Sequence, residues 1–309
     1  MTLRLAEKWV WDSWPFTDGQ GSHHLFFLQA DRSLGDPELR HWNPSIGHAV
    51  SADYREWTVL PTALAPRETP GWDDLTTWTG SVVQGPSGRY HLFYTGASRA
   101  DDGLVQRIGR ADSDDLVHWE RFGEGPLLEA DPRWYERYDG SWHDEAFRDP
   151  WVFPDPDGDG WHMFITARAK DGGDLFSRGV LGHAWSADLD SWEVRPPLSL
   201  PDRFGQMEVP QYVELDGAPH LVFCCGSGQY DPARMPADVP SGVWMMPSKG
   251  GALGPWDVAA ARRVSHDSLY AARAIVDIDG RSRLLGFSDT VDGGFVGEIL
   301  DPVDIRLDE

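Results

Sequence analysis

The sequence predicts an all-β fold, a five-bladed β-propeller built from four-stranded antiparallel blades. Three observations lead to this prediction: a turn motif recurs along the chain, an apolar strand pattern occurs five times, and a tight-turn sequence precedes each copy of that strand. Such self-similarity is typical of repeat folds. Five units of four strands, each longer than the roughly 40 residues of compact propeller blades, indicate a five-bladed propeller. The lack of helical repeat patterns and polar caps disfavours a solenoid, and the fivefold recurrence of the same order of elements disfavours a β-sandwich.

The recurring turn motif has the pattern G-x-A-x-S-x-D-[YL]-x-x-W. It occupies residues 47–57, 109–119, 182–192 and, more loosely, 242–256. Each copy predicts a strand, then a polar turn in which Ser and Asp bond nearby backbone groups, then a strand that begins with Trp. Because Trp57, Trp119 and Trp192 recur at one position of the motif, we interpret them as residues that pack one blade against another.

Five apolar, aromatic-rich segments predict a buried strand in each blade. They occupy residues 23–27, 90–96, 161–167, 219–226 and 282–288. A hairpin sequence such as GPSGR precedes each of them, and a shorter apolar run precedes each hairpin. These runs are the expected innermost strands: 9–16, 78–83, 147–153, 207–215 and 271–277. We expect one propeller domain over residues 1–309, with short helices only near Asp101 and in residues 131–138.

Composition restricts the class of partner. The chain has 50 Asp and Glu against 27 Lys and Arg, a formal net charge of −23. This excess repels nucleic acid and anionic membranes, so we expect a small neutral substrate instead. No apolar stretch approaches the roughly 20 residues of a membrane span, and the N-terminal segment lacks the apolar region of a signal peptide. A cytoplasmic location is therefore expected.

Acidic residues on the innermost strands are the candidate catalytic groups, because these strands line the central channel of a propeller. Asp12, Asp149 and Glu208 come from three different blades. Crowding of carboxyls separates their pKa values, so that one donates a proton while another stays ionised. A pair of carboxyls flanking a glycosidic bond is the apparatus of glycoside cleavage. Simple pairing of the acids with Arg148 and Arg273 remains the structural alternative.

The same segments resemble two related families of glycoside hydrolases. VWDSWPF resembles the nucleophile motif of family 68, the levansucrases and inulosucrases, whereas HHLFFLQ and GHAVSADYREW resemble family 32, the invertases, inulinases and levanases. WTGSVV and FRDPWVF are similar to the Ser-Gly-Ser and Arg-Asp-Pro segments of both families. MEVPQYVEL resembles the Glu-Cys-Pro segment of family 32. The motifs occur in the family order across residues 9–215.

This resemblance implies a role for each acid. Asp12 is then the nucleophile that attacks a fructofuranosyl unit, Glu208 the general acid and base, and Asp149 the stabiliser of the transition state, in a retaining mechanism. The resemblance also implies a fructose pocket shaped by Trp11, Gln29, Trp42, Trp78, Ser81 and Arg148. The expected activity is hydrolysis of β-fructofuranosides such as sucrose and short fructans, or fructosyl transfer from them.

The chain also departs from both families. The Asn-Asp-Pro-Asn context usual in family 32 is absent around Asp12, Val209 stands where family 68 has Arg, and no C-terminal β-sandwich is expected. Two alternatives therefore remain open. One is an inverting propeller hydrolase of the arabinofuranosidase or xylosidase type, and the other is a catalytically silent sugar-binding propeller.

Two acidic segments have some features of metal sites. Residues 155–160 have the spacing of a calcium loop, but Thr166 occupies the position of its last Glu, so we interpret the segment as a hairpin turn. His143, Asp144 and Glu145 are consecutive and cannot all face one ion from an extended chain. No Gly-rich phosphate loop opens a helix. We therefore expect no metal and no cofactor.

Overall fold

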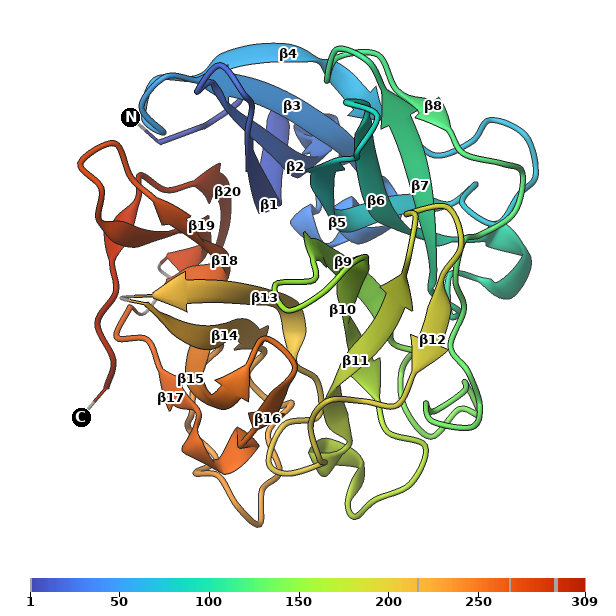
Figure 1. Ribbon diagram of the computed structural model, residues 1–309, viewed down its shortest axis with the longest axis vertical. Coiled ribbons are helices and arrows are strands. Elements are labelled where there is room, and N and C mark those ends of the chain that lie inside the picture. Colours follow the sequence, from blue (N-terminus) through green and yellow to red (C-terminus); the bar gives the residue numbers. More distant parts are fainter. Residues whose placement is uncertain (1, 216, 267, 292–293, 309) are drawn as a thin grey trace.

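The computed structural model describes residues 2–215, 217–266, 268–291 and 294–308. They form five antiparallel sheets arranged around a central axis, which confirms the predicted five-bladed propeller (Figure 1). Blade 1 comprises β1 (Lys8–Thr17), β2 (His23–Asp31), β3 (Ser45–Ser51) and β4 (Thr58–Leu64). Blade 2 comprises β5 (Thr76–Gln84), β6 (Tyr90–Ala97), β7 (Arg107–Ser113) and β8 (Glu120–Arg121). Blade 3 comprises β9 (Phe147–Pro154), β10 (Trp161–Arg168), β11 (Gly179–Ser186) and β12 (Glu193–Arg195).

The last two blades have divided outer edges. Blade 4 comprises β13 (Glu208–Leu215), β14 (Ala218–Cys225), β15 (Gly242–Gly251), β16 (Gly254–Trp256) and β17 (Arg262–Arg263). Blade 5 comprises β18 (Leu269–Val276), β19 (Ser282–Val291), β20 (Gly294–Ile299) and β21 (Val303–Asp304). In blade 4, β15 pairs with both β16 and β17, and in blade 5, β19 pairs with both β20 and β21. The N-terminal segment joins this blade through an antiparallel bridge between Leu3 and Ile299.

The recurring turn motif has the local structure that its sequence predicts. In blade 2, the Asp115 carboxylate accepts hydrogen bonds from the backbone N–H groups of Val117 and His118. Leu116 takes the left-handed conformation with φ 66°, and the Trp119 indole N–H donates to its carbonyl at 3.0 Å. The aspartate therefore fixes a tight turn that directs the following Trp toward the neighbouring blade.

Two of the three repeated Trp side chains, Trp119 and Trp192, pack against a neighbouring blade, as predicted. Trp119 of blade 2 meets Phe26 of blade 1 edge to face, with ring centroids 5.7 Å apart. Trp192 of blade 3 meets Phe93 of blade 2 in the same way at 5.5 Å, while Trp57 is half-buried against the core. Such aromatic pairs contribute about 0.5–1.5 kcal/mol each beyond the apolar area that they bury. The motif therefore sets both the turn and the contact between neighbouring blades.

Helical structure is limited to five short 3₁₀ segments in the described part of the chain. They are η1 (Arg32–Leu34), η2 (Pro37–Trp42), η3 (Arg99–Asp101), η4 (Leu175–Ser177) and η5 (Val258–Ala260). The helix expected near Asp101 is η3. The helix expected in residues 131–138 is wrong, because a turn at Asp131 leads into an isolated bridge between Tyr135 and Ala169. Among the described residues, no helix is long and apolar enough to cross a membrane.

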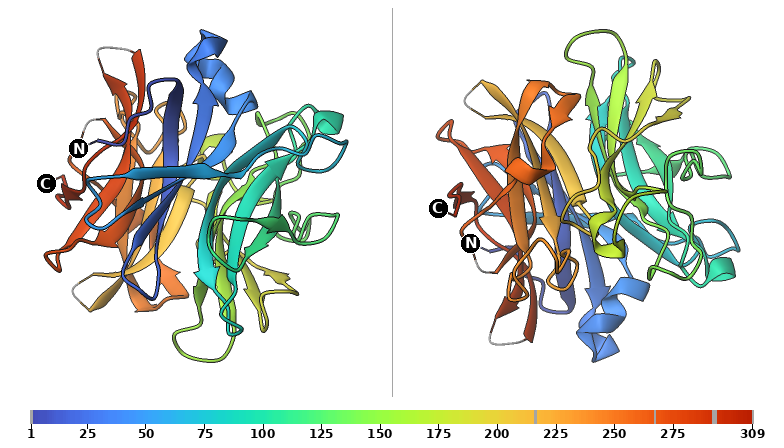
Figure 2. Two further views of the ribbon diagram at one scale, coloured as in Figure 1. Left: turned by 90° about the horizontal axis from the view of Figure 1, so that it is seen from above. Right: turned by 90° about the horizontal axis from the view of Figure 1, so that it is seen from below.

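One face of the propeller carries an additional feature. The segment with η1 and η2, between β2 and β3, stands out from the face beyond the strands (Figure 2). Asp36 is the N-cap of η2, and its carboxylate accepts a hydrogen bond from the N–H of Glu38. Pro37 at the first helical position favours this start. This projecting segment forms a rim on one face of the propeller, at the opening of a central cavity.

Candidate active site

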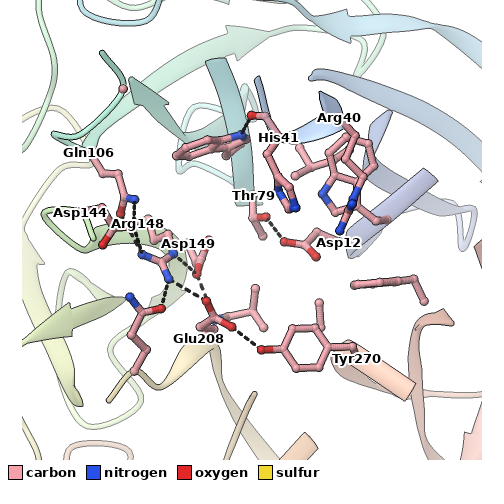
Figure 3. Close-up of a pocket in the computed structure, with 18 of the residues that line it drawn as sticks. Asp12, Arg40, His41, Thr79, Gln106, Asp144, Arg148, Asp149, Glu208 and Tyr270 are labelled. Atoms are coloured by element: carbon pink, nitrogen blue, oxygen red, sulfur yellow. Dashed lines mark hydrogen bonds and ion pairs between the residues drawn. The ribbon is translucent and has the colours of Figure 1, made fainter. Parts of the chain in front are cut away.

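A cavity of about 530 Å³ is lined by residues from all five innermost strands, β1, β5, β9, β13 and β18. The wall also contains residues from η2, from β2 and β19, from the loops that precede β7, β9 and β13, and from the connection between β14 and β15. Figure 3 shows the charged and polar side chains of several blades pointing into this space. The cavity therefore lies where the five blades of the propeller meet.

Each innermost strand is interrupted by a β-bulge at an equivalent position. The interruptions follow Trp11, Trp78, Arg148, Glu208 and Tyr270, which we call the first ring. The next residue of each strand belongs to the second ring, which comprises Asp12, Thr79, Asp149, Val209 and Ala271. All ten residues line the cavity. Four members of the second ring have positive φ, from 27° at Asp12 to 57° at Asp149. Bulges re-aim side chains, so these turn the two rings inward.

Asp12 is enclosed by groups from the other blades. The Thr79 hydroxyl donates a hydrogen bond to Asp12 Oδ2 at 2.6 Å. Burial raises the pKa of Asp12 to about 7, and the negative charges of Asp149 and Glu208 act in the same direction. The Thr79 hydrogen bond and the charge of Arg273 oppose this rise. Asp12 is therefore a carboxyl that exchanges its proton near neutral pH.

Asp149 is held more rigidly than Asp12. Its Oδ2 accepts hydrogen bonds from the Thr166 hydroxyl at 2.7 Å and from the Val209 N–H at 3.1 Å. Its own N–H donates to the Thr95 hydroxyl at 2.9 Å. Burial raises the pKa of Asp149, while Arg148 and Thr166 favour the ionised form. Threonines of two blades thus fix both the backbone and the side chain of this acid.

Glu208 is held by donors on both of its oxygens. Arg148 Nη2 lies 2.7 Å from Oε1, and the Tyr270 hydroxyl donates to Oε2 (Figure 3). Burial beside Glu208 raises the pKa of Tyr270 well above its usual value, so the phenol stays protonated. Arg148 also donates to the side-chain carbonyls of Gln106 and Gln206. These contacts fix the orientation of the Glu208 carboxyl.

Aromatic and basic side chains of η2 form the rim. The Trp42 side chain is 44% exposed, and its ring lies 6.2 Å from that of Trp78. The Trp78 indole N–H donates to the backbone carbonyl of His41 at 2.9 Å. Burial lowers the pKa of His41 to about 4, so this imidazole is neutral at pH 7. Trp42 therefore offers a flat apolar surface at the entrance, above a buried polar interior.

The structure brings most of the predicted site residues together. Seven of them line the cavity: Trp11, Asp12, Trp42, Trp78, Arg148, Asp149 and Glu208. Two others lie elsewhere. Gln29 donates to the hydroxyls of Ser45 and Thr62 within blade 1, and the Ser81 hydroxyl accepts a hydrogen bond from the Val152 N–H of the neighbouring blade. Both side chains connect strands and are absent from the cavity wall.

Several lining residues were missed by sequence reasoning. Alignment of the innermost strands at their bulges would have placed Tyr270 beside Glu208 in the first ring. Gln106, Asp144 and Gln206 lie on connecting segments, where the repeat gives no register. The sequence suggests His143 and Asp144 only as metal ligands, yet both line the cavity. The described residues contain no group of three or more His, Cys, Asp or Glu placed to hold a metal.

A five-bladed propeller whose central cavity collects carboxyls from three blades, each with different hydrogen-bond partners, defines a propeller glycosidase. Comparison with known sequences makes the assignment specific. The chain belongs to glycosyl hydrolases family 32, because the model of the N-terminal domain of that family matches residues 4–294. The predicted resemblance to the family 32 and family 68 group is thereby confirmed.

Two relatives with assigned activities act on sucrose or its 6-phosphate, as their names state. The extracellular sucrase of Zymomonas mobilis is 26% identical over 81% of this chain and 69% of that protein. The sucrose-6-phosphate hydrolase of Escherichia coli is 28% identical over 82% of this chain and 50% of that protein. The chain thus spans about half to two-thirds of the length of these two relatives.

Solved structures share the fold. An inulosucrase from Halalkalicoccus jeotgali bound to kestose superposes with a TM-score of 0.71 at 24% identity, over 94% of this chain and 79% of that chain. A family 32 β-fructofuranosidase of Bombyx mori superposes with a TM-score of 0.72 at 21% identity, over 97% of this chain and 61% of that chain. At these identities the likeness supports the propeller architecture.

Proposed function

We propose that this protein is a retaining glycosidase that hydrolyses β-fructofuranosides such as sucrose and short fructans, or transfers fructosyl units from them. The observation that carries the proposal is the convergence of Asp12, Asp149 and Glu208 on one cavity, each with a different set of partners. Family 32 membership agrees with a retaining mechanism and does not favour the inverting or catalytically silent alternatives.

In the first step, ionised Asp12 attacks the anomeric carbon while Glu208 gives its proton to the leaving oxygen. The C–O bond of the donor breaks, and a fructosyl ester of Asp12 forms. The Thr79 hydroxyl directs one oxygen of Asp12, so the other faces the sugar. In the sugar-free protein each oxygen of Glu208 accepts one hydrogen bond, from Arg148 or from Tyr270. Each oxygen has a second site, so the protonated carboxyl can donate to the leaving oxygen while Arg148 and Tyr270 stay in place.

In the second step, Glu208 removes a proton from water or from an acceptor sugar, whose oxygen attacks the ester and frees Asp12. Asp149 keeps its orientation in both steps because Thr166 and the Val209 N–H hold it. In this position it accepts hydrogen bonds from the sugar hydroxyls and stabilises the positive charge that develops on the ring. Fixed charges of this kind need no reorganisation in the transition state.

The test is incubation with sucrose, inulin, levan and synthetic arabinofuranosides, followed by product analysis and NMR of the first anomer formed. Release of fructose, or of fructosylated acceptors, with retained configuration is expected. Mass spectrometry of a quenched reaction with an activated fructoside should find one fructosyl unit on Asp12. Cleavage of arabinofuranosides alone, or an inverted first product, contradicts the proposal.

Two substitutions test the roles of the carboxyls. Asp12→Asn and Glu208→Gln should each lower kcat by about 10²-fold or more, because each removes a group that reacts directly. Asp114→Asn is the matched control, since Asp114 is an exposed acid paired only with the surface residue Arg89 among described side chains. Full activity in either active-site variant, with the fold intact by circular dichroism, contradicts the assigned roles.

A further inference from the structure

Arg273 is a fully buried cation that lies behind the cavity wall. It belongs to β18, its side chain has no solvent exposure, and it is absent from the cavity lining, although its neighbours Tyr270 and Ala271 are part of that lining. Arginine is rarely buried without a charged partner. The hydrogen bonds and the aromatic contact of its guanidinium group account for the burial of Arg273.

The first contact of Arg273 is with the bulge that carries Glu208. Its Nη1 donates to the backbone carbonyls of Val209 and Pro210, both at 2.8 Å. These two residues directly follow Glu208 and form the interruption of β13. The guanidinium also lies over the Trp151 ring of β9, 4.8 Å from the centroid. One side chain of blade 5 thus joins the innermost strands of blades 3 and 4 beside the reacting groups.

The second feature is the charge itself. Nε and Nη2 of Arg273 are buried and have no hydrogen-bond partner among the described residues. Burial lowers the pKa of Arg273 to about 10, while the charges of Asp149 and Asp12 favour its cationic form. At neutral pH the group is therefore a cation that acts on both acids through space. In a medium of low dielectric, such an interaction is much stronger than it is in water.

We propose that Arg273 is a positioning residue for the fructosyl-transfer site: from outside the cavity lining it fixes the bulge behind Glu208, and its buried positive charge favours the ionised form of Asp12. The inference rests on the proposed function, because the ionised Asp12 is the nucleophile there. It also explains how three acids share a buried cavity, since Arg148 pairs directly with Glu208 and leaves Asp12 without a hydrogen-bonded cation among the described side chains.

The charged and titratable groups around Asp12 enter the expected effect. They are Asp149 on β9, Glu208 on β13 and Arg273 on β18, together with the Thr79 hydroxyl on β5 and the Cys224 thiol on β14, whose pKa burial raises so that it stays neutral. Asp149, Glu208 and burial raise the pKa of Asp12, whereas Thr79 and Arg273 lower it. Loss of the Arg273 charge removes one of the two opposing contributions. The pKa of Asp12 then rises, and less of the nucleophile is ionised at a given pH.

The experiment compares Arg273→Gln with Arg273→Lys. Glutamine still donates hydrogen bonds to the bulge carbonyls but carries no charge, whereas lysine keeps the charge. The first readout is the pKa of Asp12, measured by ¹³C NMR of labelled aspartate carboxyls, with the Asp12 signal assigned from its loss in Asp12→Asn. We expect an increase of about one unit in Arg273→Gln and a much smaller change in Arg273→Lys.

The second readout is kcat/KM for sucrose at pH 6, which should fall roughly tenfold in Arg273→Gln and recover most of that loss in Arg273→Lys. Arg168→Met is the matched control. Arg168 is equally buried, donates to the Gly205 carbonyl at 2.6 Å and lies 3.7 Å from the Trp142 ring, but it is not among the groups that act on Asp12. This control should leave the pKa of Asp12 unchanged.

The outcomes separate the two proposals. A folded Arg273→Gln protein whose Asp12 titrates as in the wild type overturns the role of Arg273. If both Arg273 variants raise the pKa equally, the charge is not the cause and the inference is also wrong. Absence of wild-type turnover on every fructoside tested overturns the proposed function instead, and the NMR titration still decides the role of Arg273 because it needs no substrate.

Discussion

Arg55 of blade 1 forms a bidentate ion pair with Asp277 of blade 5, with N–O distances of 3.0 and 2.6 Å. The Asp277 carboxylate is completely buried and also pairs with Arg283. The first and last blades of the propeller are thus connected by one acid placed between two guanidinium groups. The bridge between Leu3 and Ile299 joins the N-terminal segment to the same last blade.

Asp277→Asn should destabilise the closed ring. The substitution leaves two guanidinium groups facing a neutral amide, and breaking a buried pair typically costs about 3 kcal/mol or more. Chemical unfolding at pH 7 measures the loss. Asp279→Asn is the control, because Asp279 pairs with the same Arg283 but is 42% exposed and should cost less than about 1 kcal/mol. Equal stability of the two variants contradicts a closing role for Asp277.

Two buried histidine pairs should make the propeller sensitive to acid. His48 accepts or donates a hydrogen bond with His24 at 2.9 Å, and His183 does the same with His162 at 3.0 Å. Burial lowers the pKa of His48 and of His183 from 6.5 to about 3. Their stabilising contribution is therefore complete above about pH 6.5 and is lost as the pH falls toward 3.

At pH 5 this linkage amounts to about 2 kcal/mol for each of the two histidines. Unfolding free energies measured at pH 7 and pH 5 give the wild-type difference. In His48→Gln, which keeps a hydrogen-bonding side chain but cannot take up the proton, the difference should shrink by about 2 kcal/mol. An unchanged difference in this variant shows that His48 is not responsible.

The charge of the cavity predicts a preference for unphosphorylated donors. Five carboxyl side chains line it: Asp12, Asp144, Asp149, Glu208 and Asp289. The two guanidinium groups of the wall already face carboxylates, since Arg148 pairs with Glu208 and Arg40 with Glu38. Like charges brought together at a binding site cost several kcal/mol. We therefore expect kcat/KM for sucrose to exceed that for sucrose 6-phosphate by roughly tenfold or more. Equal or reversed values from parallel assays contradict this reading of the cavity.

The exposed rim residue Trp42 should contribute to binding and not to folding. Trp42→Ala removes a flat apolar surface at the entrance, and such a contact is worth about 0.5–1.5 kcal/mol, so KM should rise roughly threefold to tenfold. The melting temperature should stay close to that of the wild type. Trp134→Ala is the control, because Trp134 is 36% exposed and lies outside the cavity lining. A similar KM in both variants shows that Trp42 does not contact the sugar.

The repeated parts of the fold could be predicted because they are encoded locally. The Ser-x-Asp turns, their following Trp residues and the hairpins each occur within one short stretch of chain. The three acids could be located for the same reason, since they lie at the bulges of repeated strands, Glu208 directly before its bulge and Asp12 and Asp149 within theirs. Blades 4 and 5 lack the exact motif, and their divided outer edges were not expected.

The remaining parts of the cavity depend on contacts between distant segments. The hydrogen bonds from Arg148 to Gln106 and Gln206 join residues from three different parts of the chain. Ser81 was misplaced because the bulge after Trp78 changes which side chains of β5 face the cavity. Such a change of register is invisible in a periodic pattern but decides the composition of the wall.

The ring of bulges separates the shape of the active centre from its chemistry. Each blade presents two inward-facing positions whose direction is set by the main chain. Different side chains can therefore occupy these positions on the same backbone. Blades 1, 3 and 4 hold the acids, whereas blade 2 holds Thr79 and blade 5 holds Tyr270 and Ala271. Exchange of Thr79 or Tyr270 removes a hydrogen bond to Asp12 or Glu208 but leaves the main-chain path that directs the acids unchanged. A propeller of this kind can therefore change the sugars that it accepts one residue at a time, without rebuilding its framework.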